Sequence, residues 1–231
     1  MRTFLIAFAT MLSLAAPAQA ATRTFGITSF TKVRVDGPFT VRVATGVAPF
    51  ARASGSAAAL DRLAVDVQGD TLVVHSSTSS WGGYPGANAG PVEVIVGTHD
   101  LTNAWLNGAG ILAIDRVKGL SFALSVQGSG AAEIAQVNSD QMNVSITGTA
   151  SAKLAGQTRK LTALVRGIST LQASGLASRD AMIGAEGAST IDASATNSVT
   201  VEASGPATIR LAGGGACTVK ASGAASVSGC R

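Results

Sequence analysis

The sequence predicts an all-β protein whose C-terminal half is a parallel β-helix, or solenoid, with coils of about 18–20 residues. The first observation is a glycine that recurs at spacings of 20, 20, 19, 20, 18 and 18 residues. The second is that aliphatic residues stand at fixed offsets from this glycine and alternate with polar residues, as in a strand with one buried face. The recurring glycines are Gly108, Gly128, Gly148, Gly167, Gly187, Gly205 and Gly223. A short, near-constant period of this kind is typical of stacked structural repeats.

The aliphatic columns predict the core of the solenoid. Each unit is expected to contribute about two short strands, with the glycine near the turn between them. The columns two and four residues before the glycine, and four and six residues after it, are expected to point inward. Among the residues that they predict to be buried are Leu154, Leu171, Ile191 and Ile209. The apolar period of two, with frequent glycine and β-branched residues, excludes a helical solenoid.

The outward-facing columns support the same register. They place residues of opposite charge side by side on adjacent coils, which favours that pairing. The pairs are Glu133 with Lys153, Asp192 with Arg210, Arg166 with Glu186, and Glu202 with Lys220. Another outward column carries the hydroxyl residues Ser151, Thr170, Thr190, Thr208 and Ser226. One interpretation of this column is structural: hydroxyl residues have high β-propensity and can form hydrogen bonds between coils. The alternative interpretation is functional, with the column forming a flat strip that binds ice or sugar.

Residues 1–20 have the pattern of a signal peptide. Arg2 supplies a positive charge, residues 4–14 form a short apolar run, and Ala18-Gln19-Ala20 is a small-residue cleavage site. The mature chain is therefore expected to begin at Ala21 and to be exported. No later apolar run reaches the ~18 residues of a membrane-spanning helix, so no transmembrane segment is expected in the mature chain.

Residues 21–231 are expected to form one β-helix domain. N-terminal strands and a loop occupy 21–107, and the regular coils occupy 108–231. Alternating segments predict strands over 32–35, 40–43, 63–67, 71–74 and 92–96. Only 56–62 could hold a short helix, whereas the composition of 75–91, rich in Ser, Gly and Pro, predicts a loop.

The charge balance argues against nucleic acid as the main partner. Without Arg2 the chain has 16 basic residues (17 − 1) against 13 acidic residues, a net charge of +3. This charge is small for the length of the chain, and no run of Lys and Arg reverses it.

Several segments carry a resemblance to a bacterial family. These are 35–43 (VDGPFTVRV), 69–74 (GDTLVV), and the repeat segments 128–130 (GSG) and 205–208 (GPAT). With the signal peptide, they resemble the head GIN domain family, described as autotransporter adhesins, along nearly the whole mature chain. The resemblance implies a right-handed parallel β-helix in the periplasm or at the cell surface. It supplies no catalytic motif and no established ligand.

Parallel β-helices also include polysaccharide lyases and hydrolases, so a carbohydrate-active enzyme is the alternative function. Such enzymes need clustered carboxylates or a Ca²⁺ site, and the acidic residues of the repeats are dispersed. His75 and His99 belong to no metal-binding or catalytic motif. The sequence therefore favours a non-catalytic binding or scaffold module, with no cofactor and no metal.

Scarce aromatic residues are the candidates for ligand contact. Trp81 and Tyr84 lie in the Gly/Ser loop, and Trp105 falls in an outward column. Aromatic rings on loops often stack on sugars or on partner proteins, which suggests a cell-envelope or extracellular glycan or protein as the partner. The alternative is that the loop folds back and its rings cover the side of the helix.

Cys217 and Cys230, the two cysteines of the chain, are predicted to form a disulfide. Cys217 falls in a column that is otherwise apolar, so its side chain is expected to point inward. A bond to Cys230 would hold the final segment, 223–231, over the open end of the core. Buried free thiols and an intermolecular bond in a dimer are the alternatives.

Overall fold

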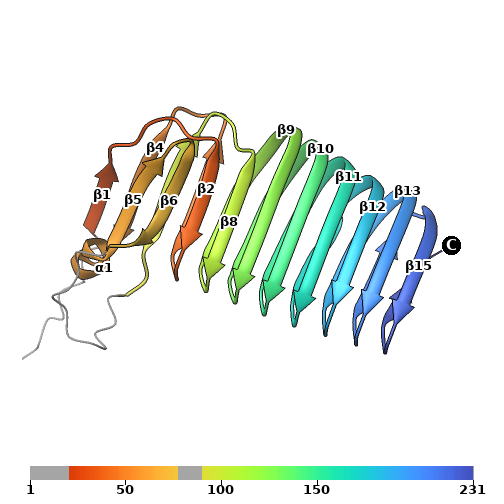
Figure 1. Cartoon of the computed structure of the whole chain (residues 1–231). Coiled ribbons are helices and arrows are strands. Elements are labelled where there is room, and N and C mark those ends of the chain that lie inside the picture. Colours follow the sequence, from red (N-terminus) through yellow and green to blue (C-terminus); the bar gives the residue numbers. More distant parts are fainter. Residues whose placement is uncertain (1–20, 78–89, 231) are drawn as a thin grey trace, which may run out of the picture.

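The computed structural model describes residues 21–77 and 90–230, which form 16 strands of one sheet and one short helix. The elements are β1 (Ala21–Phe25), β2 (Lys32–Asp36), β3 (Thr40–Thr45), β4 (Phe50–Gly55), α1 (Ala57–Asp61), β5 (Leu63–Gln68), β6 (Thr71–Ser76), β7 (Glu93–Thr98), β8 (Asn103–Gly108), β9 (Ile111–Gly128), β10 (Ala131–Gly148), β11 (Ser151–Gly167), β12 (Thr170–Glu186), β13 (Thr190–Ser204), β14 (Thr208–Ala212), β15 (Ala216–Ser222) and β16 (Ser226–Ser228). The sheet winds into an elongated solenoid (Figure 1).

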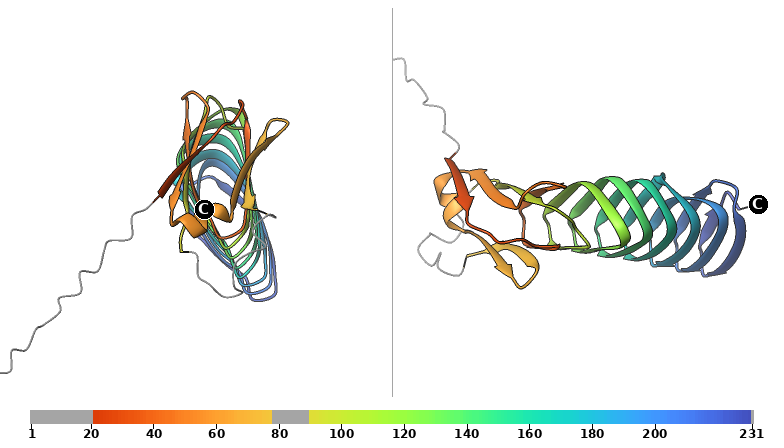
Figure 2. Two further views of the ribbon diagram at one scale, coloured as in Figure 1. Left: turned by 90° about the vertical axis from the view of Figure 1, so that its left-hand side faces the viewer. Right: turned by 90° about the horizontal axis from the view of Figure 1, so that it is seen from above.

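Each of the regular coils β9 to β13 is one continuous strand that pairs in parallel with the coils on either side. Viewed along the axis, the coils superpose as a flattened ring with two long faces (Figure 2). The prediction of stacked parallel coils is confirmed. The prediction of two short strands per coil is wrong, because β9 and β10 stay paired through the corner near Lys118. The right-handed sense of the helix stays a prediction.

The recurring glycine forms the tighter corner between the two faces. Gly148, for example, has a φ of 108°, which residues with a side chain rarely adopt. A Cβ atom there would lie 2.4 Å from the carbonyl oxygen of Gly128 on the preceding coil. Backbone conformation and close packing both require glycine at this corner, which explains the period in the sequence.

The core lies between the two faces and matches the predicted inward columns. Leu154, Leu171, Ile191 and Ile209 are at most 1% exposed. Val219 belongs to an inward column but is 40% exposed, since no further coil stacks on β15. Burial at this position therefore depends on a neighbouring coil as well as on the register.

The N-terminal strands are less regular than the coils. β2 is inserted between β6 and β8, and β3 between β7 and β9, all in parallel. Three pairs are antiparallel, namely β1 with β4, β4 with β7, and β5 with β6. Helix α1 lies where the sequence allowed a helix. The Ser56 hydroxyl caps it by accepting from the Ala59 amide at 3.1 Å, and the buried Leu60 anchors it to the N-terminal end of the core.

A disulfide joins Cys217 to Cys230, with 5.5 Å between the Cα atoms, so the predicted pairing within one chain is confirmed. Cys217 on β15 pairs with Val199 and packs against the core, as its column predicted. The segment between the cysteines includes β16, which pairs in parallel with β14. The bond therefore ties both faces of the last coil together at the end where no further coil supports them.

Reducing this disulfide, or replacing both cysteines by alanine, is expected to lower the free energy of unfolding by about 3 kcal/mol at most. The two cysteines are separated by 13 residues in sequence, so the bond closes a short loop. A disulfide stabilises the fold by lowering the entropy of the unfolded chain, and this stabilisation grows only slowly with loop length. Urea unfolding with and without reductant measures the difference. Identical unfolding midpoints would show that the last coil is held by packing alone.

Candidate functional site

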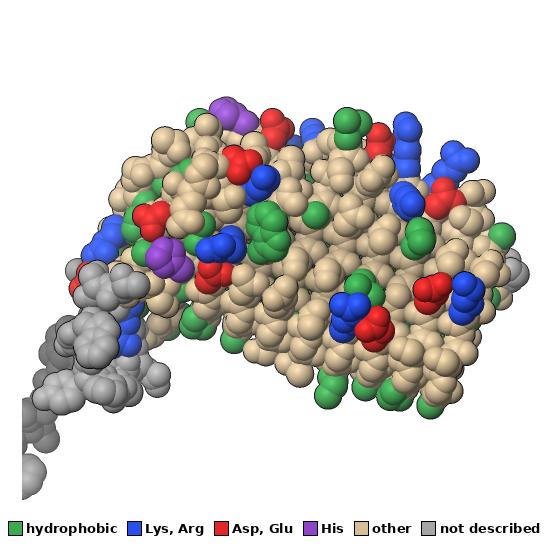
Figure 3. Space-filling view, in the orientation of Figure 1, with side chains coloured by type: hydrophobic (Ala, Val, Ile, Leu, Met, Phe, Trp, Pro, Cys, Tyr) green, Lys and Arg blue, Asp and Glu red, His purple; other side chains and the backbone are tan. Residues whose placement is uncertain are grey.

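A broad uncharged area covers one face of the solenoid beside Trp105. It is formed by the outward side chains of β8 and of the second halves of β9 and β10, and is called the Trp105 face here. Its members are Asn103, Trp105, Asn107, Ser121, Ala123, Ser125, Gln127, Gln141, Asn143, Ser145 and Thr147. Figure 3 views the molecule from this side and shows few charged groups between those near β2 and those near the C-terminal coils.

Parallel pairing determines how these side chains are arranged. Trp105 lies between Arg34 on β2 and Ser125 on β9, and its side chain is half-buried while Ala104 and Leu106 beside it are fully buried. The prediction that Trp105 points outward is confirmed, whereas its role in ligand contact stays a prediction. Successive coils repeat about every 4.8 Å, so the amide and hydroxyl groups form rows on a rigid, nearly flat surface.

Ion pairs border the Trp105 face at both ends. On the N-terminal side, Arg34 Nε lies 2.9 Å from Asp36 Oδ2, and Asn107 Nδ2 donates to Asp36 Oδ1 at 2.7 Å. On the C-terminal side, Arg166 Nε donates to Glu186 Oε2 at 2.8 Å. These charges are largely neutralised by their neighbours, so the area between them is available for neutral polar contacts.

Two carboxyl groups elsewhere on the surface have a lowered pKa. The hydrogen bond from Lys32 lowers the pKa of the Asp70 carboxyl below its usual value. Hydrogen bonds from Ser198 and Asn197 lower the pKa of Asp180 in the same way. Both shifts favour an ionised carboxylate rather than the protonated carboxyl that a general acid needs.

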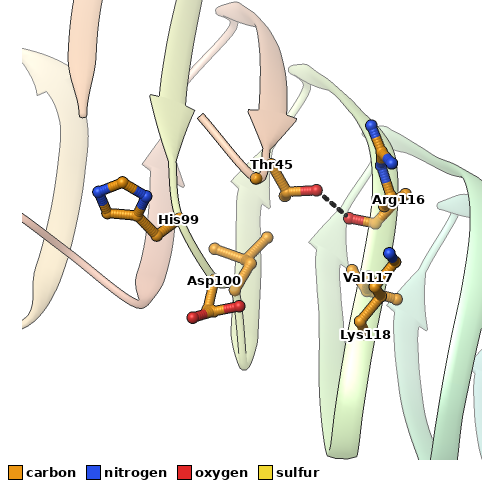
Figure 4. Close-up of a pocket in the computed structure, with 8 residues that line it drawn as sticks. Thr45, His99, Asp100, Arg116, Val117 and Lys118 are labelled. Atoms are coloured by element: carbon orange, nitrogen blue, oxygen red, sulfur yellow. Dashed lines mark hydrogen bonds between the residues drawn. The ribbon is translucent and has the colours of Figure 1, made fainter. Parts of the chain in front are cut away.

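A small hollow of about 200 Å³ lies where the N-terminal strands meet the first regular coil. Its lining residues are Thr45, Gly46, His99, Asp100, Leu101, Arg116, Val117 and Lys118. Thr45 Oγ1 donates to the Arg116 carbonyl oxygen at 2.9 Å, and the His99 ring points away from Arg116 and Lys118 (Figure 4). The hollow therefore combines the cations Arg116 and Lys118 with the Asp100 carboxylate and does not bring the histidine toward the cations.

The opposite face has a shallower depression of about 250 Å³, lined by Ile111, Ala113, Ala131, Ala132, Glu133, Ser151, Ala152, Lys153 and Gln172. The predicted hydroxyl column stands on this face, and each member pairs with the next from Ser151 to Ser226. The predicted charge pairs also form, since Lys153 donates to Glu133 at 2.9 Å and Arg210 to Asp192 at 3.3 Å. These contacts confirm the register of the outward columns.

Five of the seven carboxylates between Gly108 and Cys230, all except Asp115 and Asp180, lie within 3.4 Å of a neighbouring basic side chain. Asp140 lies 3.1 Å from Arg159, and Glu202 lies 3.4 Å from Lys220. Within residues 21–77 and 90–230, no three His, Cys, Asp or Glu side chains come together as metal ligands. His75 lies next to the last residue of β6, and its Nε2 lies 3.0 Å from Asp66 Oδ2. This arrangement gives no support to the carbohydrate-active enzyme that the sequence left as an alternative.

Some predicted features cannot be placed. Trp81 and Tyr84, like the signal-peptide segment, lie outside the described residues. Where the structure is described, none of the helices has the length and apolar character needed to cross a membrane.

The uncharged composition of the Trp105 face was not predicted, although the outward columns in the second halves of β9 and β10 already lack charge in the sequence.

Solved structures show the same fold over nearly the whole chain. A "putative adhesin" from Bacteroides fragilis is 17% identical with a TM-score of 0.82, and the alignment covers 90% of this chain and 96% of that one. A "putative lipid binding protein" from Parabacteroides distasonis is 16% identical, with a TM-score of 0.68 over 91% of this chain and 96% of that one. A "putative adhesin" from Parabacteroides merdae is 15% identical, with a TM-score of 0.65 over the same shares of the two chains.

Sequence comparison identifies the family. No curated protein matches the chain. The family model described as "Putative auto-transporter adhesin, head GIN domain" matches residues 29–215, which include the inserted strands β2 and β3 and the regular coils. The chain therefore belongs to the head GIN domain family.

Proposed function

We propose that the protein is an exported, non-catalytic binding module of the cell envelope, adhesin-like or scaffolding, whose Trp105 face contacts a glycan. The observation that carries the proposal is the uncharged polar composition of this face beside an outward tryptophan. Amide and hydroxyl side chains both donate and accept hydrogen bonds, as sugar hydroxyl groups require. The indole ring of Trp105 offers a flat apolar surface on which a sugar ring can stack.

A protein partner fits the Trp105 face less well than a glycan does. Protein interfaces are enriched in aromatic residues, Met and Arg at their centres, whereas Trp105, apart from Arg34 on β2, adjoins Asn, Gln, Ser and Ala side chains of β8 and β9. The rows are held by ladders of parallel strands, so little backbone conformational entropy is lost when a ligand binds. A flat, pre-organised polar surface suits an extended chain of sugar residues.

Export is supported by three features. Residues 1–20 have the composition of a signal peptide, the Cys217–Cys230 disulfide is typical of oxidising compartments, and the family is described as adhesins. The periplasm and the cell surface both satisfy these conditions. The non-catalytic role is supported by the ion-paired carboxylates of the coils.

Replacing Trp105 by alanine, or Asn143 by arginine, is expected to weaken glycan binding by about tenfold or more, the loss of ~1.4 kcal/mol. The first change removes the stacking surface, and the second places a long charged side chain on an exposed position of the same face. A glycan array followed by calorimetry on the mature chain, residues 21–231, measures the effect.

The matched control is Gln172→Arg, which puts the same side chain at an exposed position on the opposite face. Binding unchanged in both Trp105 face variants, or equally reduced in the control, would contradict the proposal. The same binding experiment is also made on the double variant Trp81→Ala/Tyr84→Ala. Weaker binding with an unchanged melting temperature would make the loop part of the same surface.

A further inference from the structure

Arg159 and Arg179 occupy equivalent positions on adjacent coils, at the corner opposite the glycine corner. Thr158 pairs with Ser178 and Lys160 with Asp180, which places the two arginines side by side. Like charges on neighbouring strands about 4.8 Å apart oppose strand pairing. From Gly108 to Cys230, the other charged neighbours on adjacent coils are opposite in sign, namely Glu133–Lys153, Asp140–Arg159, Lys160–Asp180, Arg166–Glu186, Asp192–Arg210 and Glu202–Lys220. Folding therefore gives no reason for this one like-charged pair.

Arg179 is poorly neutralised despite the carboxylate beside it. Its Nε lies 3.9 Å from Asp180 Oδ2, beyond hydrogen-bond distance. The other oxygen of Asp180 already accepts from Asn197 at 2.7 Å and from Ser198 at 2.5 Å. The side chains of Arg159 and Arg179 are 79% and 70% exposed, so both guanidinium groups face solvent.

The same arrangement recurs at Arg116, two coils before Arg159. Arg116 Nε also lies 3.9 Å from its neighbouring carboxylate, that of Asp115. Asp115 Oδ1 accepts from the Thr45 amide at 3.0 Å and from the Thr45 hydroxyl at 3.1 Å. Lys118 follows on the same strand, and its side chain forms no hydrogen bond or ion pair within the described part of the chain. Arg116 and Lys118 line the 200 Å³ hollow, so cations stand at both ends of this corner.

We propose that this corner binds an acidic polysaccharide through carboxylate or sulfate groups. The corner is called the cationic crest and consists of Arg116, Lys118, Arg159, Lys160 and Arg179. One acidic group occupies the hollow beside Lys118, and another bridges Arg159 and Arg179, about 10–14 Å farther along the axis at the coil spacing. A bound anion removes the repulsion between the two arginines and forms charge-assisted hydrogen bonds with their planar guanidinium groups.

The spacing of charge on the crest favours a polysaccharide over other polyanions. Duplex DNA carries one charge per ~1.7 Å of its axis, far denser than cations placed on coils about 4.8 Å apart. A flat anionic membrane would also meet Asp115, Asp140 and Asp180, which stand among the cations. A narrow chain can follow the cations and leave these carboxylates in solvent. Ser121 and Gln141, beside the crest, belong to the Trp105 face and offer hydrogen bonds to sugar hydroxyl groups.

The test measures binding of the mature chain to polygalacturonate, dextran sulfate and neutral dextran by calorimetry at low and high salt. The two acidic polymers are expected to bind, and salt is expected to weaken them, because exposed charge pairs are screened. The double variant Arg159→Gln/Arg179→Gln is expected to lose about tenfold or more in affinity for them. Lys118→Gln is expected to weaken binding at the other end of the crest. The melting temperature of the double variant is expected to stay unchanged or rise, since repulsion has been removed.

The matched control is Lys153→Gln/Arg210→Gln, which removes the same two positive charges from the face opposite the Trp105 face. An equal loss in both double variants would mean nonspecific attraction and would overturn the proposal. So would binding to anionic phosphatidylglycerol vesicles or to duplex DNA that depends on Arg159 and Arg179 while neither acidic polysaccharide binds. Trp105→Ala serves to separate the two sites. Crest binding retained in that variant supports a second site, whether or not the Trp105 face binds a neutral glycan.

Discussion

Replacing Ile191 by aspartate is expected to unfold the C-terminal coils, at a cost of several kcal/mol. Ile191 is fully buried on β13 and stacks between Leu171 on β12 and Ile209 on β14. A carboxylate there would have no basic partner, since its neighbours on both coils are aliphatic. Each coil contacts mainly the next, so the damage is expected to centre on β13, β14 and β15. Hydrogen exchange resolved by segment, together with urea unfolding, measures its extent.

The pH dependence of this variant gives an independent check. Burial favours the protonated form, so the folded pKa of an aspartate at position 191 would lie above the unfolded value of about 3.9. Because the folded pKa is raised, the loss of unfolding free energy relative to the native protein is smallest below about pH 4. This loss grows as the pH rises through the folded pKa. Thr190→Asp puts the same charge on the outward side of the same strand and serves as the control. Ile191→Ala, which leaves a cavity without a charge, is expected to cost ~2–5 kcal/mol. An unfolding midpoint of Ile191→Asp equal to that of the native protein would show that the inward register is wrong.

The regular coils were predictable because each stacks on its neighbour in sequence. Alternation, glycine spacing and opposite charges all repeat at the same interval, and these signals agree on one register. Position Val219 shows the limit of this reasoning. Its column is inward, but the strand that carries it has no following coil to cover it.

The N-terminal strands could not be arranged from the sequence. β2 pairs with β8 across about seventy residues, and β6 packs on its other side. No local period connects these segments, and the alternation of each strand fits parallel and antiparallel partners equally well. The antiparallel pair β5–β6 and the insertion of β2 are decided by tertiary packing.

The candidate sites were predictable only in part. Trp105 attracted attention because aromatic residues are scarce, and its outward column was correct. The pairing of Arg159 with Arg179 was missed, although each arginine stands eight residues before the next recurring glycine (167 − 159 and 187 − 179). Counted forward from the preceding glycine, the offsets differ (159 − 148 = 11 and 179 − 167 = 12). The ladder shifts register between Ile134 and Val137 and again between Lys153 and Ala155. Such bulges change which corner residues meet and leave no mark in a simple repeat count.

Replacing Gly148 by alanine is expected to destabilise the solenoid by ~2–6 kcal/mol, from two separate causes. The φ of 108° is strained for any residue with a Cβ atom, which accounts for ~1–3 kcal/mol. The new methyl group would also lie 2.4 Å from the Gly128 carbonyl oxygen, which belongs to the backbone of the adjacent coil and cannot move without breaking the stack. Overpacking of this kind adds a further ~1–3 kcal/mol.

Gly119→Ala separates the two causes. Gly119 stands at the opposite corner with a φ of 128°, but a Cβ atom there would meet nothing within 4 Å. Its replacement should therefore show the backbone strain without the collision and cost only ~1–3 kcal/mol. Urea unfolding of both variants gives the difference between them, which is the contribution of close packing between coils at the glycine corner. Equal destabilisation of the two would mean that backbone conformation alone accounts for the recurring glycine. A larger loss of unfolding free energy at Gly148 would show that close packing between successive coils also requires the recurring glycine.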